Sequence, residues 1–384
     1  MESRIEGNAK EEKSSFFTEL LSRYKKEAGE EKSLVPYIEK VRRKEDLEPY
    51  EAYGAMRILM SEGPSDSQRA EFLTALNAKG ESNAEIAAFV FAIREMAEPV
   101  RIKFKEGTDT VIADTCGTGG GTLDTFNIST AIMFILAASG MVIAKHGNRA
   151  ITSKCGSADV LEQLGVKIDL KPAEVEACIA KIGLGFIYAP NFHRAFKNVQ
   201  KVRKEIGVPT VFNILGPLAN PAFDARKKNG VQLLGVREPR LTRKMAEVLK
   251  LLNMKRAFVV HGCGDTRTKG MDELSTLGEN VVSELCEDGQ IKDFTIRPEE
   301  LGLKRARAED LAGGEREENK RILIDILKGK EQGAKRDIVL LNAAAGLLVG
   351  NKTKSLQEGL EVAAQLIDSG RAYEKLEQLR SFRP

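Results

Sequence analysis

The chain has 384 residues, and its 59 basic and 56 acidic side chains leave a formal net charge of only +3. This near balance does not point to a polyanion-binding surface, and a hydrophobic fraction of 42% is enough for a sizeable core. No run of about 18 apolar residues is present, so we expect no membrane span. The first residues, ESRIEGNAKEEKSS, lack the apolar core of a secretion signal.

The five cysteines are odd in number and far apart, and no HExxH pattern is present. We therefore expect neither a disulfide framework nor a zinc site. Unpaired cysteines are typical of a reducing compartment, which favours a cytoplasmic location.

The first third of the chain predicts helices. Residues 1–34 are polar and charged, and we interpret them as an N-terminal extension that forms a loose helix or tail. Over residues 35–107 apolar side chains recur at spacings of three and four, and Gly63 and Gly80 stand where helices would end. This pattern predicts a small helical domain.

The pattern changes near Thr110. Short apolar stretches (TVIAD, MVIAKHG, GFIYAP, VQLLGV and RAFVVHG) alternate with amphipathic helical stretches. Such alternation predicts an α/β domain with a mostly parallel sheet over residues 108–384. Residues 281–300 alternate around an Asp-Gly pair, which favours a hairpin, and the last stretches are helical again.

The most informative stretch is DTCGTGGGTLDTFNIST, which begins at Asp114. Four glycines lie between a predicted strand and a predicted helix, where backbone N–H groups and the helix start can bind phosphate. A tight strand-to-helix turn with Ser/Thr capping is the alternative. No GK[ST] follows, and Thr122 stands where the dinucleotide pattern needs a third glycine.

Two further stretches carry charge at the ends of predicted elements. KHGNRAITSKCGSADVLEQLG, from Lys145, follows the next strand and offers three cations and several hydroxyls that can surround a diphosphate. KGMDELS places Asp272 and Glu273 side by side, and Mg²⁺ takes one or two carboxylates together with water and substrate phosphates. Solvated polar loops are the alternative for both.

The helical stretch FHRAFKNVQKVRKEIG carries several cations, most of which we expect to be solvated. Arg203 is the one that we interpret as a carboxylate ligand. No nucleophile–base pair stands out along the chain, so we assign no catalytic acid or base.

Together, GTGG…TFNIST, KHGNR…GSADVLEQLG, VRKEIG…FNILGPLANP and MDELS resemble the anthranilate phosphoribosyltransferase family, from about Leu34 to near the C-terminus. The resemblance implies a small helical domain joined to a large α/β domain of the nucleoside phosphorylase and phosphoribosyltransferase type. It implies a returning helical piece near 200–216, a homodimer, and a site between the domains. It also implies Mg²⁺-dependent transfer of the 5-phosphoribosyl group from 5-phosphoribosyl 1-diphosphate to anthranilate in tryptophan biosynthesis.

The site residues follow from the motifs by resemblance. For the ribose diphosphate donor they are Gly117, Gly120, Gly121, Thr125, Asn127, Ser129, Thr130, Lys145, His146, Gly147, Asn148, Arg149, Ser153 and Ser157. For anthranilate they are Gly117, Asn148 and Arg203, and for Mg²⁺ they are Ser129, Asp272 and Glu273.

The sequence departs from the family pattern at four places. Gly121 stands where the family has Asp, Pro209 where it has Arg, and His193-Arg194-Ala195 where it reads HPA. The segment HGCGDTRTKG before MDELS is longer than the family pattern.

Two other functions stay open on sequence alone. A pyrimidine nucleoside phosphorylase shares the architecture but would use inorganic phosphate and a nucleoside. A non-catalytic relative that binds nucleic acid is suggested only by Arg226-Lys227-Lys228 and the basic residues from Arg237 to Lys244, which are more typical of solvated faces.

Overall fold

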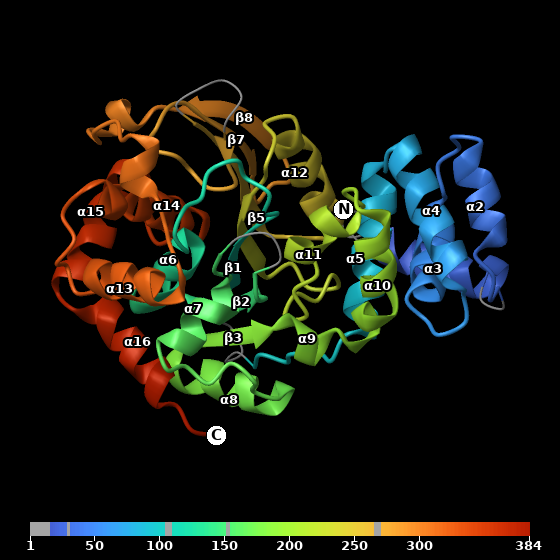
Figure 1. Ribbon diagram of the computed structural model, residues 1–384, viewed down its shortest axis with the longest axis horizontal. Coiled ribbons are helices and arrows are strands. Elements are labelled where there is room, and N and C mark those ends of the chain that lie inside the picture. Colours follow the sequence, from blue (N-terminus) through green and yellow to red (C-terminus); the bar gives the residue numbers. More distant parts are fainter. Residues whose placement is uncertain (1–15, 29–30, 104–109, 151–153, 265–269) are drawn as a thin grey trace, which may run out of the picture.

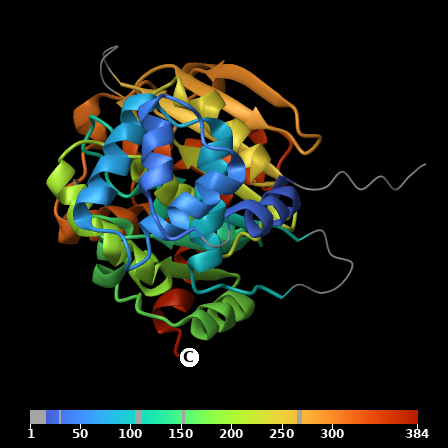
Figure 2. The ribbon, with the colours of Figure 1, turned by 90° about the vertical axis from the view of Figure 1, so that its right-hand side faces the viewer.

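The computed structural model describes residues 16–28, 31–103, 110–150, 154–264 and 270–384. Figure 1 shows a small helical domain beside a larger α/β domain, as the sequence predicts. Figure 2 views the molecule from the side of the helical domain, whose helices lie in front of the α/β domain. Within the described ranges, no helix combines the length and the apolar character needed to cross a bilayer.

The helical domain is built from α2 (Val35–Arg42), α3 (Pro49–Leu59), α4 (Asp66–Lys79) and α5 (Asn83–Met96). Capping boxes fix where α4 and α5 begin, because Ser65 and Ser82 each exchange hydrogen bonds with the residue three positions later. Apolar side chains of the four helices pack into a common core, and α5 is buried on all sides from Glu85 to Arg94.

A later piece of the chain returns to this domain. Helix α10 (Lys197–Ile206) packs on α4, and α11 (Phe212–Leu218) contacts α5. Asn198 Nδ2 donates to the Met60 carbonyl over 2.7 Å, and Lys201 Nζ pairs with Asp66 Oδ2 at 2.7 Å. Figure 1 shows α10 and α11 between the two domains.

The α/β domain has one sheet with the order β3-β2-β1-β4-β5-β7-β8, and β6 pairs with β5. The strands are β1 (Ile112–Gly117), β2 (Val142–Gly147), β3 (Leu184–Tyr188), β4 (Gly230–Gly235), β5 (Arg256–Cys263), β6 (Gly270–Met271), β7 (Asn280–Leu285) and β8 (Ile291–Ile296). Strands β1 to β5 are parallel. Strands β7 and β8 form the predicted antiparallel hairpin.

Helices cover the sheet and bury its apolar strands. They are α6 (Ile128–Ala138), α7 (Ser157–Gln163), α8 (Pro172–Ile182), α9 (Ala189–Phe192), α12 (Leu241–Leu251), α13 (Arg316–Leu327), α14 (Ala334–Val349), α15 (Leu356–Asp368) and α16 (Arg371–Ser381). Helix α6 is apolar all round because it lies between the strands and the C-terminal helices α14, α15 and α16. Its sequence, ISTAIMFILAA, therefore needs no polar face beyond its first turn.

The sheet changes direction between β1 and β4. The chain runs outward from β1 through β2 to β3, and then resumes at β4 on the other side of β1. In open α/β sheets, the crevice at such a switch point, outside the carboxyl ends of the strands, is where ligands bind. The topology therefore predicts a ligand site at the carboxyl ends of β1, β2 and β4.

Part of the N-terminal extension packs against the helical domain. Residues 16–28 form helix α1 (Phe16–Arg23) and a π-helical turn (Tyr24–Ala28). Phe17 is buried, and its ring centroid lies 4.3 Å from that of Phe91 on α5. Phe17 and the buried Leu20 lie in FFTELLSR, a short amphipathic stretch within a charge-rich extension, so the overall composition of residues 1–34 conceals it.

We expect Phe17→Ala to lower the free energy of unfolding by about 3 kcal/mol, because it removes a buried ring from the helical domain. Urea denaturation measures this loss. Val208→Ala is the matched control, since Val208 is 51% exposed and should change stability by less than about 0.5 kcal/mol. Equal, small effects of both substitutions would show that α1 adds nothing to the fold.

Candidate active site

Two glycines at the switch point let an acidic segment lie across the strand ends. Gly117 ends β1, Gly235 ends β4, and the two are register partners. A Cβ on Gly117 would overlap the Asp272 carboxylate, and a Cβ on Gly235 would overlap the Asp272 carbonyl. The acidic segment, residues 271–273, can lie there only because both positions lack a side chain.

The carboxylates of this segment face the glycine-rich loop, residues 117–121. Asp272 Oδ2 accepts a hydrogen bond from the Gly119 amide over 2.8 Å. Glu273 Oε2 is buried and has no hydrogen-bond partner among the described residues. Burial raises the pKa of Asp272, and burial together with the Asp272 charge raises the pKa of Glu273 well above its usual range. Such a pair favours a bound cation.

The predicted Mg²⁺ ligands lie close together. Ser129, Asp272 and Glu273 line the same small cavity, together with Thr115. No group of three or more His, Cys, Asp or Glu side chains with metal-binding geometry occurs in the part of the chain that the structure describes. The metal ligands that the protein offers here are two carboxylates and a hydroxyl. This set suits Mg²⁺, which can take its remaining ligands from water and a substrate phosphate.

A buried cation lies beside this cavity. Lys145, on β2, is 1% exposed, and its Nζ donates to the Thr115 carbonyl over 2.5 Å and lies 3.3 Å from Ser129 Oγ. Burial lowers the pKa of Lys145, and the charge of Asp114 opposes this effect. Asp114 in turn accepts hydrogen bonds from Asn220 Nδ2 at 2.9 Å and from the His146 amide at 3.3 Å.

The glycine-rich loop leads to two polar groups without partners at the start of α6. Gly119 and Gly120 have φ values of +68° and +76°, which favour glycine. Asn127 donates through Nδ2 to the Cys155 carbonyl over 2.9 Å, while its Oδ1 and the hydroxyl of Thr130 are buried and have no partner among the described residues. Gly121 and Thr125 are half-buried on the same stretch. These groups are available to a ligand.

The predicted diphosphate loop follows β2. A Cβ on Gly147 would overlap Ser157 Oγ, so this position favours glycine. Ser157 Oγ donates a hydrogen bond to the Asn148 carbonyl over 3.3 Å. Asn148 is exposed. Ser153 lies outside the described residues.

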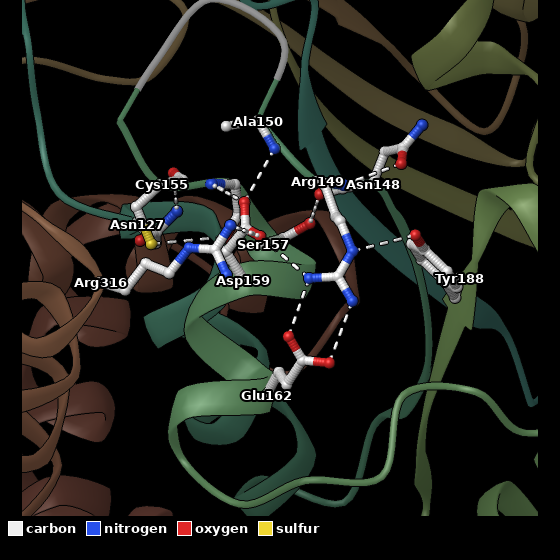
Figure 3. Close-up of polar contacts among 11 residues, drawn as sticks. Asn127, Asn148, Arg149, Ala150, Cys155, Ser157, Asp159, Glu162, Tyr188 and Arg316 are labelled. Carbon is white, nitrogen blue, oxygen red and sulfur yellow. Dashed lines mark hydrogen bonds and ion pairs between the residues drawn. The ribbon is translucent and has the colours of Figure 1, made fainter.

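The Arg149 guanidinium is paired with side chains of the protein. Its guanidinium pairs with Glu162 and Asp159 and donates from Nε to Tyr188 Oη, as Figure 3 shows. Its assignment to the donor stays a prediction.

The predicted acceptor residue on α10 lies toward α11. Arg203 is half-buried, and its guanidinium carbon lies 5.0 Å from the centroid of the Phe212 ring. Burial lowers the pKa of Arg203, and no carboxylate within the described ranges pairs with it. A half-buried arginine of this kind is a suitable ligand for a substrate carboxylate.

Two histidines, His146 on β2 and His193 after α9, are buried near each other. The rings of His146 and His193 are 5.1 Å apart and edge to face, and neither Nε2 has a partner among the described residues. Burial lowers the pKa of both, that of His193 to about 4, so both are neutral at physiological pH. The donor motif predicts His146, whereas His193 stands out in the sequence only as a departure from the family pattern.

Four residues at the site are not among those that the sequence analysis assigns to it. Asp114 and Asn220 hold the end of β2, and Gly235 makes room for the acidic segment. Arg237 follows β4, its amide donates to Thr118 Oγ1 over 3.2 Å, and its Cδ lies 3.7 Å from the point where Gly120 would carry a Cβ. Only the LANP stretch with Asn220 carries a recognisable signal.

Comparison with known proteins decides the family. Residues 109–373 match the family model described as "Glycosyl transferase family, a/b domain", and residues 35–97 match the "helical bundle domain" of the same family. The anthranilate phosphoribosyltransferase of Petrotoga mobilis is 47% identical over 346 residues, which cover 90% of this chain and 96% of the relative. That of Methanocorpusculum labreanum is 48% identical over 343 residues, which cover 89% and 96%.

This chain belongs to the anthranilate phosphoribosyltransferase family.

Solved structures of the anthranilate phosphoribosyltransferase family share the fold. The enzyme from Thermus thermophilus superposes with a TM-score of 0.81 at 42% identity, covering 90% of this chain and 98% of that one. The Saccharomyces cerevisiae enzyme in complex with PRPP and Mg has a TM-score of 0.79 at 28% identity, covering 90% and 96%. These comparisons confirm the predicted family and fold class.

The basic clusters that suggest nucleic acid are largely paired. Arg226 pairs with Asp224, Arg240 with Glu238, and Arg243 with Glu247 and Asp293. Pairing of this kind is typical of solvated surface faces.

We expect His193 to make stability depend on pH. Its folded pKa of about 4 lies below the ordinary value of 6.5. Between these values the unfolded chain takes up a proton here and the folded chain does not, so stability falls as pH falls, by up to about 1.4 kcal/mol per pH unit. His193→Leu should lose this part of the slope and keep the part that His146, whose pKa burial also lowers, contributes. Unfolding free energies of both proteins at pH 6.5, 5.5 and 4.5 measure it, and parallel curves would contradict the assignment.

Proposed function

We propose that this chain transfers the 5-phosphoribosyl group from 5-phosphoribosyl 1-diphosphate to anthranilate and releases pyrophosphate, with Mg²⁺, in tryptophan biosynthesis. The observation that carries the proposal is the acidic segment, seated on Gly117 and Gly235 beside the glycine-rich loop in a chain of this family. The Saccharomyces cerevisiae relative is described in complex with PRPP and Mg, and also with 4-fluoroanthranilate.

The donor would bind across the carboxyl ends of β1 and β2. The amides of Gly120 and Gly121 and the free groups of Asn127 and Thr130 would supply hydrogen bonds. Lys145 supplies a positive charge held in place before the donor arrives. Asp272, Glu273 and Ser129 would hold Mg²⁺, which when bound neutralises charge on the leaving diphosphate.

The acceptor would lie between the two domains. Arg203 comes from α10, which packs on the helical domain, while Gly117 and Asn148 come from the α/β domain. A guanidinium without a protein carboxylate can bind the carboxylate of anthranilate and direct its amine toward the ribose. Because an aromatic amine is already neutral, attack needs no strong base, and positioning of the two substrates supplies most of the rate.

This account explains why the site has no acid–base dyad. The two histidines nearest to it have lowered pKa values, so neither is charged at physiological pH. As the bond to the diphosphate breaks, positive charge develops on the ribose ring, as in other oxocarbenium-like transition states. The carboxylates and Lys145 would act through fixed charge.

We also infer a homodimer, a cytoplasmic location, and domain boundaries at residues 34 and 107, with the piece near 200–216 joining the helical domain. The family resemblance supports the dimer, and the unpaired cysteines support a reducing compartment.

Loss of anthranilate fluorescence tests the function directly. With the diphosphate donor and Mg²⁺ we expect anthranilate to disappear in step with pyrophosphate release, and a chelator should stop both. Phosphorolysis of thymidine or uridine in place of this reaction would favour a nucleoside phosphorylase and overturn the proposal.

We expect Arg203→Ala to raise the anthranilate KM roughly thirtyfold or more, since losing one partner of a buried charge pair costs about 2 kcal/mol or more. The donor KM should stay the same. Lys204→Ala, an exposed cation on the same helix, is the control and should leave both constants unchanged. An unaltered anthranilate KM in Arg203→Ala would remove Arg203 from the acceptor site.

We expect Asp272→Asn combined with Glu273→Gln to raise the Mg²⁺ concentration for half-maximal activity at least roughly tenfold, because two carboxylate ligands are lost. The titration should be repeated with Asp124→Asn, which changes an exposed carboxylate close to the loop and should have no effect. Superimposable Mg²⁺ curves for wild type and the double variant would exclude these residues as ligands.

A further inference from the structure

We propose that Asn342, on α14, is a positioning residue that fixes the acidic segment in place, so that its two carboxyl groups face Ser129 before a metal ion binds. The proposal rests on the proposed function, in which Asp272, Glu273 and Ser129 hold Mg²⁺. It adds to that site a residue that lies outside the motifs from which the family resemblance was drawn.

Asn342 lies in the apolar stretch IVLLNAAAGLL of α14 and is 1% exposed. Its Oδ1 accepts a hydrogen bond from the Leu274 amide over 2.9 Å, and its Nδ2 donates to the Leu274 carbonyl over 2.8 Å. Nδ2 also donates to the Ile338 carbonyl over 2.9 Å. Because one side chain satisfies both backbone groups of Leu274, it fixes the position and the orientation of the backbone there.

Leu274 directly follows the acidic segment. The preceding residue is Glu273, whose buried Oε2 has no hydrogen-bond partner among the described residues. An unpaired buried carboxyl oxygen is unfavourable, so a loosely held segment would turn Glu273 toward water. The lack of side chains at Gly117 and Gly235 leaves room for the segment, but room alone does not hold it there. The hydrogen bonds from Asn342 supply an attachment.

A second asparagine fastens the next residue. Asn280, at the start of β7, is fully buried. Its Oδ1 accepts a hydrogen bond from the Ser275 amide over 2.6 Å, and its Nδ2 donates to the Ser275 carbonyl over 3.0 Å. Two consecutive residues, Leu274 and Ser275, are thus held by two different elements, which restricts the movement of the adjoining Glu273.

Helix α14 also sets where the acidic segment lies relative to α6, whose first turn carries Ser129. Gly346 lies four residues after Asn342, on the same side of α14. A Cβ on Gly346 would overlap Leu136 of α6, so the missing side chain lets the two helices pack closely. Asn342 itself lines the small cavity that the three candidate metal ligands share. One helix therefore positions the carboxyl groups against the hydroxyl.

Hydrogen exchange of the full-length protein tests the positioning role without metal or substrate. The Gly119 amide donates to Asp272 Oδ2, and the Thr122 amide donates to the Gly270 carbonyl over 3.0 Å, so both report whether the segment stays in place. We expect Asn342→Leu to speed exchange at both amides at least roughly fivefold, with exchange in β2 and β3 unchanged. Unchanged exchange at Gly119 and Thr122 would overturn the proposal.

Asn319→Leu is the matched control. Asn319 is 2% exposed and bonds the amide and the carbonyl of Gly314 in the same two-way manner, over 3.1 and 3.0 Å. Its loss should lower the free energy of unfolding by a similar amount and leave exchange at Gly119 and Thr122 unchanged. If both variants speed exchange at these amides equally, Asn342 acts only on general stability, and the positioning role is wrong.

Metal dependence gives a second readout. Asn342→Leu should raise the Mg²⁺ concentration for half-maximal activity roughly tenfold, while the anthranilate KM at saturating Mg²⁺ stays the same. Asn319→Leu should leave the Mg²⁺ titration unchanged. Asn342→Ser, whose side chain is one bond shorter, should shift the titration in the same direction and replaces Asn342→Leu if that variant does not fold. An unshifted titration in a folded Asn342 variant would contradict the proposal.

The two readouts separate this proposal from the proposed function. Faster exchange at Gly119 and Thr122 in Asn342→Leu, in a protein whose wild type transfers no phosphoribosyl group, would retain the positioning role and reject the function. Unchanged exchange would reject the positioning role whatever reaction the wild type catalyses.

Discussion

The site depends on one steric constraint, which is the absence of side chains at Gly117 and Gly235. These two residues end neighbouring strands at the switch point of the sheet, and the acidic segment lies directly over them. That placement brings Asp272 to within a hydrogen bond of Gly119 and puts Glu273 in the cavity with Ser129. The pairing of β1 with β4 therefore positions both the candidate metal-binding groups and the glycine-rich loop.

Electrostatics follow from this geometry. Two carboxylates are buried side by side, so burial and, for Glu273, the neighbouring charge raise their pKa values, and a divalent cation would relieve both effects. Lys145 and Asp114 form a second buried pair near the end of β2, where hydrogen bonds to Thr115 and Asn220 offset only part of the cost of burial. The site thus places acidic and basic groups together in a buried setting, where a bound cation and a bound phosphate would each favour the charged forms.

The sequence predicted the elements well because each carries a local signal. Alternating apolar runs marked the parallel strands, and the Asp-Gly pair marked the β7–β8 hairpin. Glycine density marked the loop before α6. The family motifs then led to Asp272 and Glu273, which the structure brings to the glycine-rich loop although 153 positions separate Asp272 from Gly119.

What the sequence missed depends on tertiary contacts. Gly235 looks like the end of an ordinary strand until the acidic segment is seen above it. The cations of the 145–156 stretch look equivalent in sequence, yet Lys145 is buried in the site and Arg149 is paired with Glu162 on α7. Order in residues 16–28 comes from Phe17 meeting Phe91, a contact between segments far apart in the chain.

The most direct test is a calorimetric titration of the diphosphate donor into the wild type and into Gly235→Ala, with Mg²⁺ and with chelator. The wild type should bind the donor much more tightly with Mg²⁺. Gly235→Ala displaces the acidic segment, so its donor affinity should be equally weak with and without the metal. If Gly235→Ala keeps the full Mg²⁺-dependent gain, the acidic segment does not need its place on the two glycines, and the account of the site is wrong.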